Sequence, residues 1–288
     1  MRPHFSRAGL LALTCLFAGI TPIFFQGNQA EIEQQKSQPG DSIQETVRRN
    51  LSEDVDEEDG ARNLFLLGDE AVPALIKFLS DSDKAIRASA ARGIAYIGNQ
   101  RGMQALRTAV KAERDTETKS AISCFLAGRL VETKSESDLH FLRSAVEGAH
   151  FSDDDEKDFS AFCAALALGM MGRSDSLPIL RKAAGDSEEI GKAILWMENK
   201  SASRQATTGP AASDEELIKR LVLDHTFFAA RERDKTSVEN VAFNRARTKV
   251  LVSLEIYLNP KSARGYDLVL AKEGRAWRVV GIWFAWVA

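Results

Sequence analysis

The chain has 288 residues, of which 38 are basic and 41 acidic, so its formal net charge is −3. Such a small negative charge gives no electrostatic indication of nucleic-acid binding, which favours a strongly basic face, so we expect no nucleic-acid partner. The length allows two domains with a real core, and the 44% of hydrophobic residues indicates a folded body.

The first 30 residues have the pattern of an export signal. Residues 1–7 include two arginines, and residues 8–25 are uncharged and apolar, as in a secretory signal peptide. We therefore expect an exported protein, periplasmic or extracellular. The alternative is an uncleaved membrane anchor, because the apolar run 8–25 is about long enough to span a bilayer. The polar residues 31–43 that follow predict a flexible tether.

Residues 44–199 predict stacked pairs of amphipathic helices. The clearest stretch, residues 81–98 (DSDKAIRASAARGIAYIG), opens with Asp and Ser, repeats apolar residues at helical spacing and ends in glycine. A second helix is expected over residues 102–112. The last nine residues of this stretch, 90–98, recur in character at residues 164–172, and in weaker form at residues 60–68 and 123–131. Copies roughly 26 to 41 residues apart are typical of helical-pair solenoids, whose core forms only by stacking.

The string D-x-D-x-x-I-R-x-x-A-A-x-x-I-x-x-I-G, with V-P-A-L-I before it, resembles HEAT-like repeats of the kind also found in phycobilin lyases. The resemblance extends over about residues 44–199. Arg87 matches the usual arginine of the family, but Ser120 and Ala161 stand at that position in the third and fourth copies. The resemblance implies an α-solenoid that binds a protein partner along one face. It implies no catalysis by itself, and no motif specifies a bilin ligand.

The last third of the chain predicts a different kind of structure. Residues 200–213 form a linker by composition, and residues 214–288 predict a small α+β domain. Its helix carries Leu217, Leu221 and Phe228 on one face. Alternating patterns then predict strands over residues 249–259, 264–272 and 275–287. The expected fold class is mainly α: a solenoid of HEAT-like helical pairs, then a small domain with a helix on an antiparallel sheet.

The ending KEGRAWRVVGIW resembles the closing strands of NTF2-like and cystatin-like domains, which often have a pocket between helix and sheet. The resemblance implies a candidate ligand pocket lined by His225, Phe228, Tyr257, Trp277 and Trp283. His225 would act as a general base only with a substrate proton within hydrogen-bonding reach. The alternative is that the tryptophans are core and sheet-covering residues.

The sequence lacks the common motifs of catalytic and metal-binding sites. There is no H-E-x-x-H, G-x-S-x-G, Walker loop or G-x-G-x-x-G. We therefore expect no catalytic, cofactor-binding or metal-ligating residues, and a binding protein rather than an enzyme. The acidic runs 53–59 and 153–155 are candidate cation sites, but exposed helix-start charge is the favoured interpretation.

Cys124 and Cys163 lie in neighbouring repeats, two positions apart in repeat register. They should therefore face differently around their helices. Packed helix axes lie about 8 to 10 Å apart, whereas bridged Cα atoms must lie within about 7 Å. An oxidising compartment would permit a disulfide, but we expect two buried thiols.

Two functional hypotheses follow. The first is an exported scaffold whose solenoid binds a protein partner. The alternative is a ligand-binding or enzymatic NTF2-like domain carried on a repeat platform.

Overall fold

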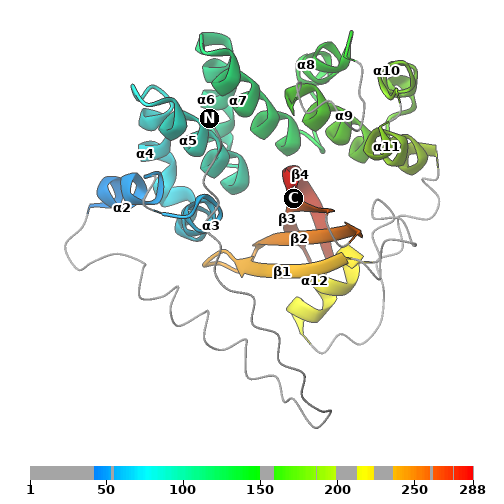
Figure 1. Ribbon diagram of the computed structural model, residues 1–288. Helices are drawn as coiled ribbons and strands as arrows, with labels where there is room; N and C mark the ends of the chain where they lie inside the picture. The colour runs from blue at the N-terminus through cyan, green and yellow to red at the C-terminus, as the bar shows by residue number, and fades with distance from the viewer. Residues whose placement is uncertain are drawn as a thin grey trace. The chain divides into compact units, whose positions relative to one another are not determined.

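The computed structural model describes residues 42–52, 55–149, 159–185, 187–198, 213–223, 236–259, 262–274 and 276–287. All of these residues belong to one compact unit that spans residues 40–288. Figure 1 shows its helices from blue to green, followed by a helix in yellow and a sheet in orange and red. The predicted fold class, mainly helical with an antiparallel sheet at the C-terminus, is confirmed.

The helical region is built from short helices in close succession. Their bounds are α2 (Ile43–Asn50), α3 (Glu57–Leu67), η1 (Gly68–Ala71), α4 (Val72–Phe78), α5 (Lys84–Ile97), α6 (Gln100–Ala112), α7 (Thr116–Arg129), α8 (Glu136–Val146), α9 (Phe159–Met171), η3 (Ser174–Ser176), α10 (Leu177–Ala183) and α11 (Glu188–Glu198). Helices α3, α5, α7, α9 and α11 each pack against the next and form what we call the front layer. Helices α2, α4, α6, α8 and α10 form the back layer.

Helix α5 illustrates why these residues fold as they do. The Asp83 carboxylate accepts a hydrogen bond from the Ala85 N–H at 2.8 Å, which satisfies a donor of the first turn. Gly98 ends the helix with a φ of 63°, a left-handed conformation that glycine adopts without strain. Both features were predicted. The next helix, α6, begins at Gln100, two residues earlier than expected, because the Asn99 side chain caps it.

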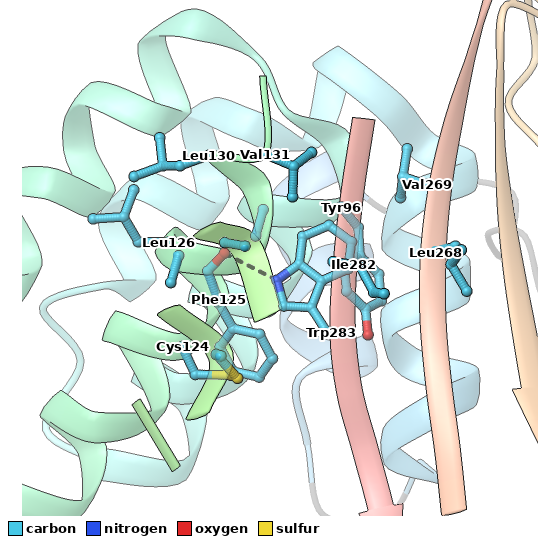
Figure 2. Packing of buried hydrophobic residues seen from close by; sticks show 14 of the residues in the cluster. Tyr96, Cys124, Phe125, Leu126, Leu130, Val131, Leu268, Val269, Ile282 and Trp283 are labelled. Atoms are coloured by element: carbon cyan, nitrogen blue, oxygen red, sulfur yellow. Dashed lines mark hydrogen bonds between the residues drawn. A yellow bond between two sulfur atoms is a disulfide. The ribbon is translucent and has the colours of Figure 1, made fainter. Parts of the chain in front are cut away.

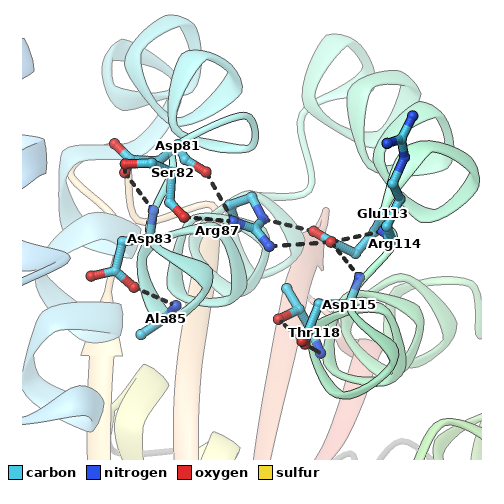
Figure 3. Close-up of polar contacts among 9 residues, drawn as sticks. All are labelled: Asp81, Ser82, Asp83, Ala85, Arg87, Glu113, Arg114, Asp115 and Thr118. Atoms are coloured by element: carbon cyan, nitrogen blue, oxygen red, sulfur yellow. Dashed lines mark hydrogen bonds and ion pairs between the residues drawn. The ribbon is translucent and has the colours of Figure 1, made fainter.

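Arginine–carboxylate pairs join successive repeats. The Arg87 guanidinium of α5 donates to both Glu113 carboxylate oxygens, at 2.7 and 3.1 Å, and to the Asp81 carbonyl (Figure 3). These hydrogen bonds lower the pKa of Glu113. Arg107 forms a similar two-bond pair with Asp138, at 2.8 and 2.7 Å, and so connects α6 to α8. An arginine–carboxylate pair with two hydrogen bonds fixes the relative orientation of the two helices and also stabilises their contact.

The sheet is a four-stranded antiparallel meander in the order β1-β2-β3-β4. Its strands are β1 (Thr236–Phe243), β2 (Lys249–Asn259), β3 (Ser262–Glu273) and β4 (Ala276–Val287), and helix α12 (Asp214–Leu223) precedes them. Strands β2, β3 and β4 confirm the three predicted ones, whereas β1 was missed. The pairing of β1 with β2 shifts between Val238 and Asn240. This bulge disrupts the simple alternation by which a strand is recognised in a sequence.

The two faces of the sheet differ in what covers them. Asp214, at the start of α12, accepts hydrogen bonds from Lys272 and Trp277, which are paired across β3 and β4. Helix α12 therefore lies on the face of Lys272 and Trp277. The opposite face contacts the front layer through Trp283 and Asp267. None of the helices in the described ranges is long and apolar enough to cross a membrane.

Candidate functional site

Trp283 of β4 is the main contact between the sheet and the front layer. Its side chain is only 1% exposed. The indole Nε1–H donates to the Phe125 carbonyl of α7 at 3.0 Å, and the ring centroid lies 4.8 Å from that of Tyr96 on α5 (Figure 2). A buried indole needs such an acceptor for its N–H. The front layer thus holds a tryptophan presented by a β-strand.

Two glycines make room for this indole. A Cβ added at Gly128 of α7 would overlap the indole ring of Trp283 and the Ile282 carbonyl. A Cβ at Gly281 of β4 would overlap the six-membered ring of the same indole. Helix and strand can therefore approach this closely only because both positions lack a side chain.

A β-bulge in β4 aims Trp283 at the helices. Gly281 pairs with Val269 and Val279 with Leu270, so Val280 is an extra residue in β4. Without the bulge, Trp277 and Trp283, six positions apart, would share one face of the sheet. Instead they lie on opposite faces. The carbonyl of Val280 accepts a hydrogen bond from the Arg129 guanidinium of α7.

A buried carboxylate forms a second contact between the layers. The Tyr96 hydroxyl donates to Asp267 of β3 at 2.5 Å, and the Ser253 hydroxyl of β2 donates to its other oxygen at 2.7 Å. Asp267 is 7% exposed, and these bonds offset the free energy of burying it. Burial first, and then the charge of Asp267, raise the pKa of Glu58 on α3.

Two cations cover the C-terminal end of α5. The Lys249 ammonium of β2 donates to the Ile97 carbonyl at 2.5 Å, and the Arg129 guanidinium lies where a Cβ on Gly98 would be. Burial lowers the pKa of Arg129 to about 10, with a further contribution from the charge of Arg278. Burial and the charge of Arg129 likewise lower the pKa of Lys249. The last carbonyls of a helix lack partners and carry partial negative charge, which cations stabilise.

The predicted thiols form a disulfide, which corrects the sequence interpretation. Cys124 of α7 and Cys163 of α9 are bonded, with their Cα atoms 5.1 Å apart. Two positions along a helix correspond to about 200° of rotation. When two parallel helices lie side by side, the right flank of one faces the left flank of the other. Residues on opposite sides of their own helices therefore come into contact. The two-position difference in repeat register therefore brings the two cysteines together, directly beside Phe125 (Figure 2).

The predicted pocket residues are found in different places. Trp277 is buried on the α12 face, where its indole N–H points to Asp214 at 3.4 Å and its ring lies against Phe243. Trp283 is on the other face, so these two tryptophans do not line a common pocket. Tyr257 is 48% exposed on β2. His225 and Phe228 lie outside the described residues.

Sequence reasoning missed the residues that join sheet and helices, namely Tyr96, Gly128, Arg129, Lys249 and Asp267. One signal was available. Asp267 interrupts the apolar strand sequence GYDLVLA, and a charge inside a buried strand indicates that a polar partner lies opposite.

The acidic runs show no ligand geometry in the part of the chain that is described. Asp56 caps α3 by accepting from the Glu58 and Asp59 N–H groups, as a helix-start residue should. Residues 153–155 lie outside the described ranges. No group of three or more His, Cys, Asp or Glu side chains that could hold a metal ion occurs among the described residues.

Comparison with protein families links part of the helical region to a known repeat. No curated protein sequence is similar to this chain. The family model for HEAT repeats matches residues 60–127, which extend from α3 to α7. Tyr96 and Phe125, which hold Trp283, lie within this range. The match to HEAT repeats therefore includes residues of α3, α5 and α7 that contact the sheet, while the further sheet contacts at Gly128, Arg129 and α9 lie outside the matched range.

Proposed function

We propose that this protein is an exported scaffold that binds another protein through its repeats. HEAT repeats generally bind proteins, and residues 60–127 match that family. The observation that carries the proposal is the Trp283 contact. The front layer already binds a β-strand of this chain, β4. The Trp283 indole is buried there, it donates to the Phe125 carbonyl, and it occupies the space that the missing side chain of Gly128 leaves free. Buried aromatic anchors of this kind dominate protein interfaces.

The sheet leaves only part of the solenoid for a partner. It contacts the front layer at α3, α5, α7 and α9, and ion pairs from Arg245 to Glu70 and from Arg278 to Glu132 continue the contact at the surface. A partner in trans therefore binds the repeats where the sheet does not lie.

Export is supported by the disulfide as well as by the N-terminal pattern. Disulfides persist in oxidising compartments and are rare in the cytosol. Cell fractionation followed by N-terminal sequencing tests this part. An exported protein beginning near residue 31 supports a cleaved signal, whereas recovery of the intact chain in the cytosolic fraction would contradict export.

The scaffold is tested by affinity capture of a tagged full-length chain from its native fraction, followed by mass spectrometry. We expect one protein to be enriched in a fixed ratio to the chain. The matched control is Leu142→Asp, which places a charge at a fully buried position of α8 and disrupts the repeats. Enrichment that is equal with this control, or absent with the wild type, would count against the scaffold.

A ligand-binding or enzymatic C-terminal domain is not proposed. Trp277 and Trp283 face opposite sides of the sheet, and Trp277 is held by Asp214 and Phe243. No contact among the described residues favours a pocket between helix and sheet.

A further inference from the structure

We propose that the back layer of the solenoid, at α2, α4 and α6, docks an acidic segment of the partner protein. This inference deepens the proposed function and rests on it. The front layer is covered by the sheet, so the back layer is the long repeat surface that remains.

Charge is unevenly divided between the two helical layers. The front-layer helices contain seven basic and seven acidic residues, whereas the back-layer helices contain nine basic and three acidic ones. Within α2, α4 and α6 alone there are six basic residues and one acidic residue, so this part has a formal charge of +5. The whole chain has a net charge of −3. Arg107 is paired with Asp138 and Arg48 with Asp81, so the docking surface depends on the exposed cations Lys77, Arg101 and Lys111.

Helix α6 presents a regular polar stripe on this surface. Arg101, Gln104, Thr108 and Lys111 are all exposed, and their spacing of three, four and three residues places them on one side of the helix. Neither Arg101 nor Lys111 forms an ion pair with any described residue. Both cations are thus available to an external carboxylate.

The neighbouring helices extend the positive surface. Lys77 of α4 is exposed, and its ammonium contacts the neutral Gln44 side chain of α2 at 3.4 Å rather than a carboxylate. Arg48 of α2 lies over the Phe78 ring, and its ion-pair distance to Asp81 is a long 3.6 Å. Arg87, by contrast, is fully engaged by Glu113 at 2.7 Å. Lys77, Arg101 and Lys111 are therefore exposed cations that form no ion pair with a described residue.

The chemistry of the stripe favours a protein segment over other polyanions. Arg101 and Lys111 are separated by about 15 Å along the helix axis, which an extended peptide spans with about five residues. Gln104 and Thr108 lie between them and can hydrogen-bond to a peptide backbone. The stripe has no large apolar side chain of the kind that an interfacial helix inserts into a lipid surface. A long polyanion would also meet the net negative charge of the rest of the chain.

The test is a titration of the full-length chain with a fluorescein-labelled peptide of alternating glutamate and glycine, followed by fluorescence anisotropy at low ionic strength. The variant is Arg101→Glu with Lys111→Glu. The matched control is Lys119→Glu with Lys134→Glu, because these lysines are exposed outside the back layer and the change in charge is the same. Anionic lipid vesicles and a DNA duplex serve as competing probes.

We expect the back-layer variant to weaken peptide binding about tenfold and the control to change it by less than about twofold, since local pairs outweigh net charge at short range. Equal weakening by both variants, no measurable binding by the wild type, or tighter binding of vesicles or DNA than of the peptide would overturn the proposal.

Affinity capture with the same variant separates the two proposals. A partner that is captured equally by wild type and by the back-layer variant leaves the scaffold in place and overturns this docking surface. Failure of the wild type to capture any partner contradicts the scaffold and, with it, the docking surface.

Discussion

The indole of Trp283 donates a hydrogen bond to the backbone carbonyl of Phe125, across a sequence separation of 158 residues. This bond joins β4, the last strand, to helix α7 of the helical region. The bond lies beside the Cys124–Cys163 disulfide, which joins α7 to α9. Helix α7 is therefore linked at this point both to the next helix of the front layer and to the sheet.

Replacing Trp283 by Ala should destabilise the protein strongly. Truncating a fully buried tryptophan typically lowers the free energy of unfolding by about 3–5 kcal/mol, because it leaves a cavity and removes apolar contacts. Urea unfolding followed by circular dichroism measures the loss. The control is Tyr257→Ala at an exposed position, which should change stability by less than about 0.5 kcal/mol. An equal loss of stability in the two variants would contradict the role of Trp283 as the main contact between sheet and helices.

Gly128→Ala should destabilise, although alanine normally favours a helix over glycine. The added methyl would overlap the indole of Trp283 and force the strand away from α7, an overpacking effect of about 1–3 kcal/mol. Gly191→Ala in α11 is the matched control, because nothing lies within 4 Å of the added methyl. That change should stabilise by up to about 1 kcal/mol. Thermal unfolding should show a lower melting temperature for Gly128→Ala and a higher one for Gly191→Ala. A change in the same direction for both variants would contradict the close approach of β4 to α7.

The Cys124–Cys163 bond should contribute measurably to stability. Its removal by Cys124→Ala with Cys163→Ala is expected to lower the free energy of unfolding by about 2–4 kcal/mol. Alkylation of the denatured, unreduced wild type, followed by mass spectrometry, checks that the bond forms. We expect no label on either cysteine until a reductant is added, and labelling beforehand would show that the thiols are free.

The Arg87–Glu113 pair should make stability depend on pH in the acid range. The Arg87 hydrogen bonds lower the pKa of Glu113 from its ordinary value of 4.5. A carboxyl group with a lowered folded-state pKa stabilises the fold above the unfolded-state value. That contribution is lost as the pH falls through the folded-state value.

Glu113→Gln should therefore be less stable than wild type by about 1–3 kcal/mol near neutral pH. The difference should shrink as the pH falls below 4.5. Denaturant unfolding at a series of pH values measures it. Glu147→Gln, at an exposed position, is the control and should change the free energy of unfolding by less than about 0.5 kcal/mol. A pH-independent difference for Glu113→Gln would contradict the role of the pair.

Local signals in the sequence determined the elements themselves. Asp83 and Gly98 fix the ends of α5 because a cap and a left-handed glycine act within a single turn. The alternation in residues 249–259 identified β2 for the same reason, since it reflects neighbours along one strand. The HEAT-like repeat was visible because it returns at intervals along the chain.

Only the tertiary structure decided how these elements meet. The bulge at Val280 sends Trp277 and Trp283 to opposite faces, although their spacing alone places them on the same one. The facing flanks of α7 and α9 unite two cysteines that repeat register seemed to separate. Strand register and helix flank depend on contacts between residues far apart in the chain, and a pattern that is read over a few neighbouring residues carries no information about them.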